Sequence, residues 1–139
     1  MALSETITEE TIRLVKEAKK LGAKVTFDSN YRSKLWTIEE ASRVIKKILP
    51  FVDYCSMGEL DALNLVGIPD TDKQAKVERI TYFYDEMNAK FPNISVFFST
   101  FREVISSNEN KLTGTFCKNG KTFISKEYHI PYIVDRVGG

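Results

Sequence analysis

The stretch "AKVTFDSNYRSKLWTIEEASRVIKKILP", residues 23–50, decides the fold. Residues 23–28 form a short run typical of a β-strand, and the polar segment 29–36 is predicted to be a loop. Residues 37–50 repeat apolar side chains at helical spacing. A second strand is predicted at residues 51–57, directly after the stretch. Residues 23–57 together therefore form the first strand–helix–strand unit of a sheet.

The rest of the chain extends this unit and then changes character. Three further helices and one further apolar strand are predicted, the helices at residues 5–22, 58–67 and 72–92 and the strand at residues 94–100. Strands separated by helices indicate a parallel sheet whose faces are covered. Beyond Thr100 the chain consists of short β-like runs, and Asn119-Gly120 is a strong hairpin signal. We therefore predict one α/β domain over residues 1–139, with antiparallel strands near its C-terminal edge.

Several residues carry signals for where these helices begin and end. Three pairs have the spacing of a capping box: Thr6 with Glu9, Thr37 with Glu40, and Ser56 with Glu59. Gly22 stands where a glycine commonly follows the end of a helix. Apolar residues fall near one face of the first helix, namely Ile7, Leu14, Val15, Ala18 and Leu21.

Composition and charge argue against several classes of protein, namely nucleic-acid-binding, membrane-spanning and secreted proteins. The chain has 139 residues, of which 42% are hydrophobic and 28% charged, which is normal for a globular protein. A net charge of +1 argues against nucleic acid as a partner. No apolar run is long enough to span a membrane, and the N-terminus lacks the features of a signal peptide. The two cysteines, Cys55 and Cys117, are far apart and are expected to be reduced, so the sequence predicts a cytoplasmic protein.

Ligands of open α/β sheets bind outside the carboxyl ends of the strands, which selects four segments here. They are residues 28–36, 56–59, 99–103 and 135–139. The first is the richest in polar chemistry, and its Arg32 could hold a carboxylate or a phosphate through two hydrogen bonds. The alternative is a solvated loop in which Arg32 pairs with Asp28 and Trp36 fills the core.

The other segments also admit two interpretations. Glu59 either completes a capping box with Ser56 or orders a metal-bound water near a phosphate. Ser99, Thr100 and Arg102 are either ligand contacts or ordinary polar residues at a strand end. The chain has neither of the common glycine-rich phosphate-binding motifs, and its single histidine with two distant cysteines makes a zinc site improbable.

Four sequence motifs, in the same order along the chain, resemble those of a known family. "DSNYRSKLW" (28–36) resembles the D-x-N-x-R-x-x-L-W signature of the ribokinase-like, phosphofructokinase-B type carbohydrate kinases. It is most like the 2-keto-3-deoxygluconate kinases, whose branch also holds fructokinases. "VDYCSMGELDAL" (52–63) and "ISVFFSTFREV" (94–104) resemble later elements of the family in the right order. "VDRVGG" (134–139) resembles the opening of its D-x-x-G-A-G-D anion-hole signature.

The resemblance implies a three-layer α/β/α, ribokinase-like fold that is incomplete at both ends. It lacks the N-terminal lid region and the C-terminal helix that carries the catalytic aspartate. The implied parent activity is ATP-dependent phosphorylation of 2-keto-3-deoxygluconate, with ATP and Mg²⁺ as cofactors. Whether a monovalent cation is a further cofactor is left open by the resemblance. The small-molecule partners would be an acid sugar and ATP.

The resemblance also assigns roles to individual residues. Substrate-binding residues would be Arg32, Tyr31 and Asp135, and the metal residue would be Glu59. Nucleotide-binding residues would be Asn30, Ser99, Thr100, Phe101, Arg102, Glu103, Val104, Gly138 and Gly139. No catalytic residue is assigned within the chain, although the anion hole would begin at Gly138 and Gly139.

The sequence departs from the family pattern in ways that bear on activity. Ser56 stands where the family usually has asparagine, the segment 99–104 lacks the usual glycines, and Gly139 replaces alanine. The Gly and Asp that continue the anion-hole signature are absent, and that Asp is the catalytic base. We therefore expect the 139-residue chain alone to be inactive. The alternatives are a fructokinase or other ribokinase-like sugar kinase, and a non-catalytic α/β module that binds ligands or self-associates as a homo-oligomer.

Overall fold

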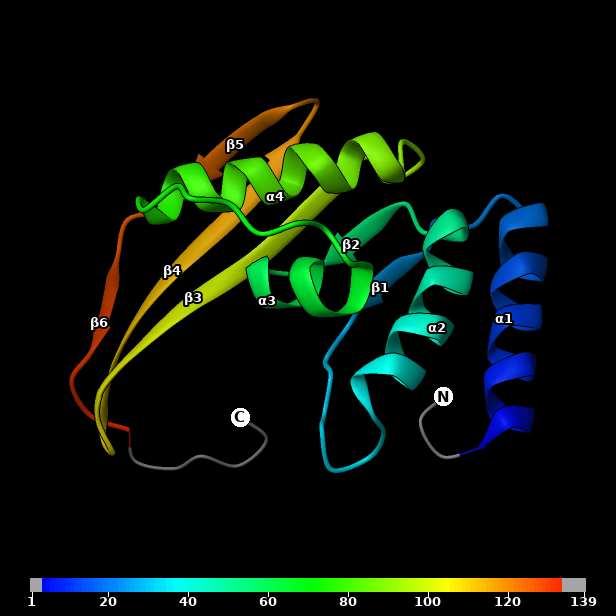
Figure 1. Cartoon of the computed structure of the whole chain (residues 1–139), viewed down its shortest axis with the longest axis horizontal. Helices are drawn as coiled ribbons and strands as arrows, with labels where there is room; N and C mark the ends of the chain where they lie inside the picture. Colours follow the sequence, from blue (N-terminus) through cyan, green and yellow to red (C-terminus); the bar gives the residue numbers. More distant parts are fainter. Residues whose placement is uncertain (1–3, 134–139) are drawn as a thin grey trace.

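A computed structural model describes residues 4–133 of the chain, which form a mixed six-stranded sheet with helices packed on it (Figure 1). The elements in chain order are α1 (Glu5–Lys20), β1 (Thr26–Asp28), α2 (Ile38–Ile48), the 3-10 helix η1 (Leu49–Phe51), β2 (Tyr54–Ser56), α3 (Glu59–Asp61), the π-helix η2 (Ala62–Val66), α4 (Lys76–Lys90), β3 (Val96–Ser106), β4 (Glu109–Lys118), β5 (Lys121–Ile124) and β6 (Tyr128–Ile130). The predicted strand at 94–100 thus continues without a break to Ser106.

The sheet is parallel among its first three strands and antiparallel beyond them. The strand order is β1-β2-β3-β4-β5, and β6 pairs with β4. Phe27, Cys55 and Phe97 occupy one row across the parallel strands. Two successive crossovers that add strands in the same direction place α2 and α4 on the same face, because such connections are right-handed. The α/β class with antiparallel strands at the C-terminal edge is confirmed.

The ends of α1 follow only part of the sequence prediction. Ser4 is the N-cap, because its backbone is extended and its Oγ accepts a hydrogen bond from the Ile7 N–H at 3.2 Å. The predicted Thr6–Glu9 capping box is therefore wrong, since the helix already begins at Glu5. Gly22 follows the end of the helix with φ +82°, a conformation that favours glycine, as predicted.

Two other local signals are confirmed. Thr37 and Glu40 form a capping box at the start of α2, with the Glu40 N–H donating to Thr37 Oγ1 and the Thr37 N–H donating to the Glu40 carboxylate. Asn119 and Gly120 both have positive φ angles, 52° and 69°, in the tight turn between β4 and β5. This is the backbone that a two-residue hairpin of this type requires.

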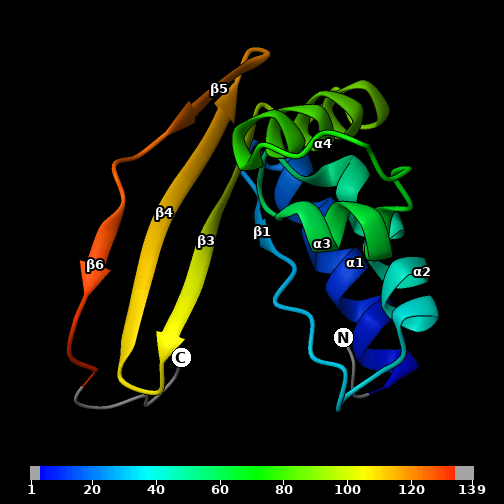
Figure 2. The same cartoon turned by 60° about the vertical axis from the view of Figure 1, so that its left-hand side comes forward.

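The core lies between one face of the sheet and the helices. Ile45 of α2 and Phe83, Tyr84 and Met87 of α4 are fully buried against strands β2, β3 and β4. The Tyr84 ring stacks on Phe97 of β3 with 5.8 Å between the ring centroids. Figure 2 shows the helices gathered on one side of the sheet. None of the helices in residues 4–133 is long and apolar enough to cross a membrane.

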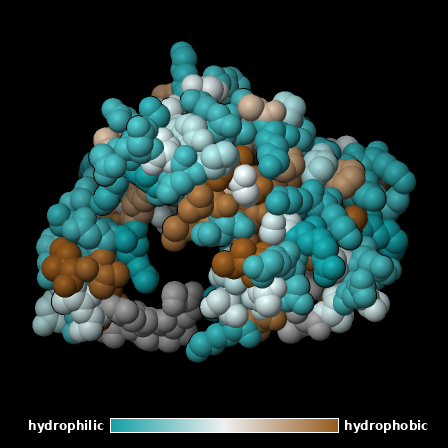
Figure 3. All heavy atoms as spheres, viewed as in Figure 1, coloured by the Kyte–Doolittle hydropathy of each residue, from teal (hydrophilic) through white to brown (hydrophobic). Residues whose placement is uncertain are grey.

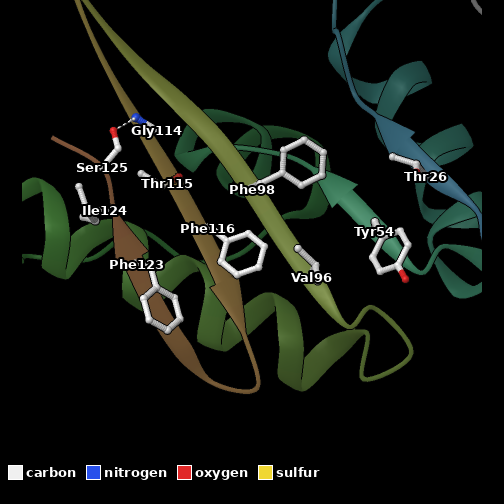
Figure 4. A pocket seen from close by; sticks show the side chains of 10 residues that line it. All are labelled: Thr26, Tyr54, Val96, Phe98, Gly114, Thr115, Phe116, Phe123, Ile124 and Ser125. Atoms are coloured by element: carbon white, nitrogen blue, oxygen red, sulfur yellow. Dashed lines mark hydrogen bonds between the residues drawn. The ribbon is translucent and has the colours of Figure 1, made fainter. Parts of the chain in front are cut away.

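The opposite face of the sheet is apolar and is not covered by residues 4–133. Side chains alternate between the two faces along each strand, so Tyr54, Val96, Phe98, Phe116 and Phe123 lie on the side away from the helices. They line a shallow cavity of about 790 Å³ that runs from β1 to β5 (Figure 4). Of the three layers predicted, the described residues therefore form two.

The apolar face predicted for α1 is also largely unburied by the described residues. Leu21 is 87% exposed and Leu14 is 59% exposed, whereas only the partly buried Ile12 of this helix packs against the core. The helix contributes instead through charge. Its Lys19 Nζ donates to both carboxylate oxygens of the buried Asp53, at 2.9 and 2.8 Å.

Asp53 is the centre of a polar cluster at the amino end of β2. Lys24 Nζ also donates to its Oδ1 at 3.2 Å, and the Val25 N–H donates to Oδ2 at 2.8 Å. Burial by itself would raise the pKa of this carboxyl, but the hydrogen bonds from Lys19, Val25 and Lys24 outweigh it and lower the pKa to about 2. The cluster therefore fixes α1 and β1 to the second strand.

Candidate active site

A polar cleft of about 610 Å³ lies at the carboxyl ends of β1, β2 and β3. It is lined by residues 28–31, 56–61 and 99–102, which come from three of the four segments selected from the sequence. Figure 3 shows the molecule hollowed between the β3–β4 hairpin and α3. The topology thus brings together the three segments that the sequence placed after successive parallel strands.

Backbone pairing extends past the strand ends and holds these segments side by side. The Ser29 N–H donates to the Ser56 carbonyl at 3.2 Å, and the Met57 N–H donates to the Phe98 carbonyl at 3.1 Å. After β1 the chain turns sharply, because the Asn30 N–H donates to Asp28 Oδ1 at 3.2 Å. Asn30 itself has φ 34°, a left-handed conformation that asparagine tolerates better than most residues.

The loop after β1 presents Tyr31 and Arg32 in different ways. Tyr31 is half-buried in the cleft wall, and its hydroxyl donates to the Trp36 carbonyl at 3.2 Å. Arg32 is exposed beside the cleft lining, and its guanidinium makes no hydrogen bond or ion pair with any residue in 4–133. The predicted alternative of an Arg32–Asp28 pair is therefore wrong, although Trp36 does pack against the core. The cation is available to an anionic ligand.

The end of β3 brings Ser99, Thr100, Phe101 and Arg102 to the cleft. The Ser99 hydroxyl, however, also belongs to a triangle with the hydroxyls of Tyr84 and Thr115. The three oxygen–oxygen distances are 2.9 Å for Tyr84–Ser99, 2.7 Å for Tyr84–Thr115 and 2.8 Å for Ser99–Thr115. Burial raises the pKa of Tyr84 in this triangle. Ser99 thus serves the packing of α4 on the sheet as well as the cleft wall.

Two residues assigned to the nucleotide do not reach the cleft. Glu103 pairs with Lys76 of α4 at 3.7 Å, and Val104 is 56% exposed farther along the hairpin. They miss the cleft because β3 is one long strand that continues into the hairpin instead of turning after Thr100. The remaining assigned residues, Asp135, Gly138 and Gly139, lie outside the described residues.

The cleft wall after β2 begins with a short helical turn. Gly58 is the N-cap of α3, and its N–H donates to Asp61 Oδ2 at 3.2 Å. The predicted Ser56–Glu59 capping box is wrong, because Ser56 still belongs to β2 and the helix starts only at Glu59. The Glu59 carboxylate is therefore not used as a cap.

Glu59 instead pairs with Arg79, which lies in the first turns of α4. Arg79 Nε donates to Glu59 Oε1 at 2.8 Å, and Nη2 donates to the same oxygen. Hydrogen bonding to Glu59 raises the pKa of Arg79. Sequence reasoning did not identify Arg79, because it is 20 positions from its partner and no spacing rule connects two residues that meet only through the packing of α3 and α4.

The acidic residues of the cleft suit Mg²⁺ only when a phosphate is also present. Asp28, Glu59 and Asp61 line the cleft, but no group of three or more His, Cys, Asp or Glu side chains within residues 4–133 is placed to hold a metal ion. Mg²⁺ in phosphoryl-transfer sites is typically held by one or two carboxylates together with substrate phosphates and water. The residues present fit that arrangement.

The comparisons with known proteins agree with the motifs. No protein-family model matches the chain. A solved PfkB-family carbohydrate kinase of Listeria grayi superposes on 96% of this chain with a TM-score of 0.86 and 40% identity. The 2-dehydro-3-deoxygluconokinase of Thermotoga maritima superposes on 95% with a TM-score of 0.86 and 30% identity.

Curated sequences agree over a shorter range. The 2-dehydro-3-deoxygalactonokinase of Haloferax volcanii is 42% identical over 60 residues, which are 43% of this chain and 19% of that enzyme. The chain spans 39% of the length of each of the two solved kinases. The ribokinase-like fold and the resemblance to PfkB-type carbohydrate kinases are therefore confirmed, over the part of those proteins that the chain covers.

Proposed function

We propose that this chain is a section of an ATP-dependent sugar kinase whose substrate is 2-keto-3-deoxygluconate. The observation that supports this most is Arg32, a cation that has no partner among residues 4–133 and lies beside a cleft formed by three strand ends. A guanidinium matches a carboxylate through two parallel hydrogen bonds, so it suits an acid sugar better than a neutral one. The names of the similar kinases support the same substrate class.

The cleft suggests how the described residues divide the work. Arg32 would hold the sugar carboxylate, with Tyr31 in the wall beside it and Asn30 at the turn. Thr100 and Arg102 would lie along the nucleotide, where the cation of Arg102 offsets phosphate charge. Glu59 would hold Mg²⁺ jointly with the phosphates of ATP, and the metal, when bound, would neutralise charge on the transferred phosphoryl group.

The residues outside the described range complete the proposal. Asp135 would contact the sugar, and the backbone N–H groups of Gly138 and Gly139 would begin an anion hole for the transferred phosphoryl group. We infer that residues 1–139 are a single domain corresponding to a partial kinase core. A fructokinase is the alternative within the enzymes, because the same family branch contains both.

Ligand binding to the 139-residue chain tests the substrate class. NMR spectra recorded during titration with 2-keto-3-deoxygluconate should show shifts among residues 28–36, and fructose should give much weaker shifts. Arg32→Ala should lower the affinity for the acid sugar by about tenfold, because a charge-assisted hydrogen bond contributes about 1.5 kcal/mol or more. Arg43→Ala, an exposed α2 residue, is the matched control. Equal responses to fructose and the acid sugar would contradict the substrate proposed.

We expect the 139-residue chain alone not to catalyse the phosphoryl transfer. In the family signature the Asp that follows the two glycines takes the proton from the sugar hydroxyl, and residues 1–139 do not include that Asp. A coupled assay of ADP release with the acid sugar and Mg·ATP should therefore give no signal above background. Sustained turnover would show that another residue serves as the base.

A second function is favoured by the open face of the sheet. The open cavity of about 790 Å³ is lined by Tyr54, Val96, Phe98, Phe116 and their neighbours, and residues 4–133 leave this apolar sheet face uncovered. A second copy of the chain could cover it. Light scattering should then report a dimer at micromolar concentration, and Phe116→Asp should restore the monomer. A wild-type monomer at all concentrations would argue against self-association.

A further inference from the structure

Arg79 of α4 uses all of its N–H groups on partners from two other segments. Besides Glu59, its Nη2 donates to Asp70 Oδ1 at 2.9 Å, and its Nη1 donates to the carbonyls of Thr71 at 2.9 Å and Lys73 at 3.2 Å. The side chain is only 20% exposed. An arginine in this position ties α4, the loop at residues 70–73 and the cleft wall together through the fixed geometry of one planar group.

The contact with Glu59 is one-sided. Both hydrogen bonds from Arg79 go to Oε1, and Oε2 accepts no hydrogen bond from any residue within 4–133. The Glu59 side chain is 24% exposed and lines the cleft. One oxygen is therefore held by the protein, and the other remains for a ligand in the cleft.

We propose that Arg79 is a positioning residue, which holds Glu59 through Oε1 so that Oε2 is presented to a divalent cation in the cleft. The inference rests on the proposed function, because it assumes that the cleft receives Mg²⁺ with a phosphate. Arg79 itself is not among the residues that line the cleft. Its role is to restrict the motion of the carboxylate and to link it to the loop at residues 70–73.

A purely structural role for Arg79 makes a different prediction. If the arginine only fastens the loop to α4, then its loss removes a positive charge close to Glu59, and Coulomb attraction alone should make a cation bind more tightly. If the arginine positions the carboxylate, its loss should weaken cation binding in spite of the more favourable charge. Losing a partner of this kind typically lowers metal affinity by 10- to 100-fold.

The experiment uses the 139-residue chain with Mn²⁺ as the probe, detected by paramagnetic broadening of the amide signals of Gly58 and Ser29. Arg79→Ala should weaken the binding about tenfold. Arg79→Lys keeps the charge but not the fork, and should restore only part of the affinity. Glu59→Gln should abolish the broadening. Asp70→Asn, which removes a loop partner and leaves the Glu59 pair intact, is the matched control and should stay within about twofold of wild type.

A second measurement does not require the metal. NMR relaxation of the Glu59 side-chain carbons should report an ordered side chain in the wild type and in Asp70→Asn, and a mobile one in Arg79→Ala. If wild type fails to bind Mn²⁺ but this difference in order is found, positioning is supported and the metal role in the proposed function is lost. Unchanged Glu59 order in Arg79→Ala, or tighter Mn²⁺ binding in that variant, would overturn the inference.

Discussion

Replacing Asp53 by asparagine removes the negative charge at the centre of the cluster that joins α1, β1 and β2. The amide has nearly the same size and can still accept the Val25 N–H, so the change removes charge without opening a cavity. What is lost is the attraction to the two lysines, Lys19 at 2.8 Å and Lys24 at 3.2 Å. Because the Asp53 side chain is only 9% exposed, water replaces little of that interaction.

The loss of stability expected for Asp53→Asn follows from the pKa of the Asp53 carboxyl. A lowering of the pKa from the ordinary value of 3.8 to about 2 corresponds to about 2 kcal/mol of stability at neutral pH. Because the pKa of the folded state is depressed, this contribution is fully present above about pH 4 and is lost as the pH falls through about 2. Asp53→Asn should lack it at every pH.

Urea denaturation across a pH series measures both effects. At neutral pH the free energy of unfolding of Asp53→Asn should be about 2 kcal/mol below that of the wild type, and the gap should close between about pH 4 and pH 2. Asp72 is exposed and forms no ion pair with any residue in 4–133, so Asp72→Asn should differ little from wild type. A gap of the same size at acid and neutral pH would refute the electrostatic explanation.

Two further predictions concern the packing of the sheet, and both are measured by chemical denaturation. Tyr84→Phe should cost about 1 kcal/mol, because it removes two hydrogen bonds but leaves Ser99 and Thr115 bonded to each other. A loss above about 3 kcal/mol would mean that the hydroxyl triangle is a single cooperative unit. Gly120→Ala should cost about 1 kcal/mol through the backbone alone, because its φ is +69° and no atom lies within 4 Å of the added Cβ. An unchanged stability would show that the turn relaxes.

Local signals in the sequence predicted most of the fold. The hairpin at Asn119-Gly120 and the capping box at Thr37 depend on neighbouring residues only, so both could be predicted from the local sequence. The apolar spacing of α1 predicted the helix and its apolar face, of which Leu14 and Leu21 are exposed. Periodicity reports which face is apolar, and whether that face is covered depends on chain beyond the helix.

The topology predicted from the sequence located the candidate site. The features of the site that the sequence did not predict depend on how distant segments pack. Parallel strands place their carboxyl ends together, so the three segments that form the cleft could be selected without a structure. The pairing of Glu59 with Arg79 could not, because it arises from the packing of two helical segments distant in sequence. Glu103 and Val104 were assigned by motif order, but β3 continues into the hairpin beyond Arg102, and these two residues do not line the cleft.

The most direct test of the central proposal is a chimeric kinase. The segment of the Thermotoga maritima 2-dehydro-3-deoxygluconokinase that superposes on this chain, 39% of that enzyme, would be replaced by these 139 residues. If the chain is the corresponding section of such a kinase, the folded chimera should release ADP with 2-keto-3-deoxygluconate, and Arg32→Ala should reduce kcat/KM for that sugar by at least about tenfold. A folded chimera with no activity, or one indifferent to Arg32→Ala, would contradict the account.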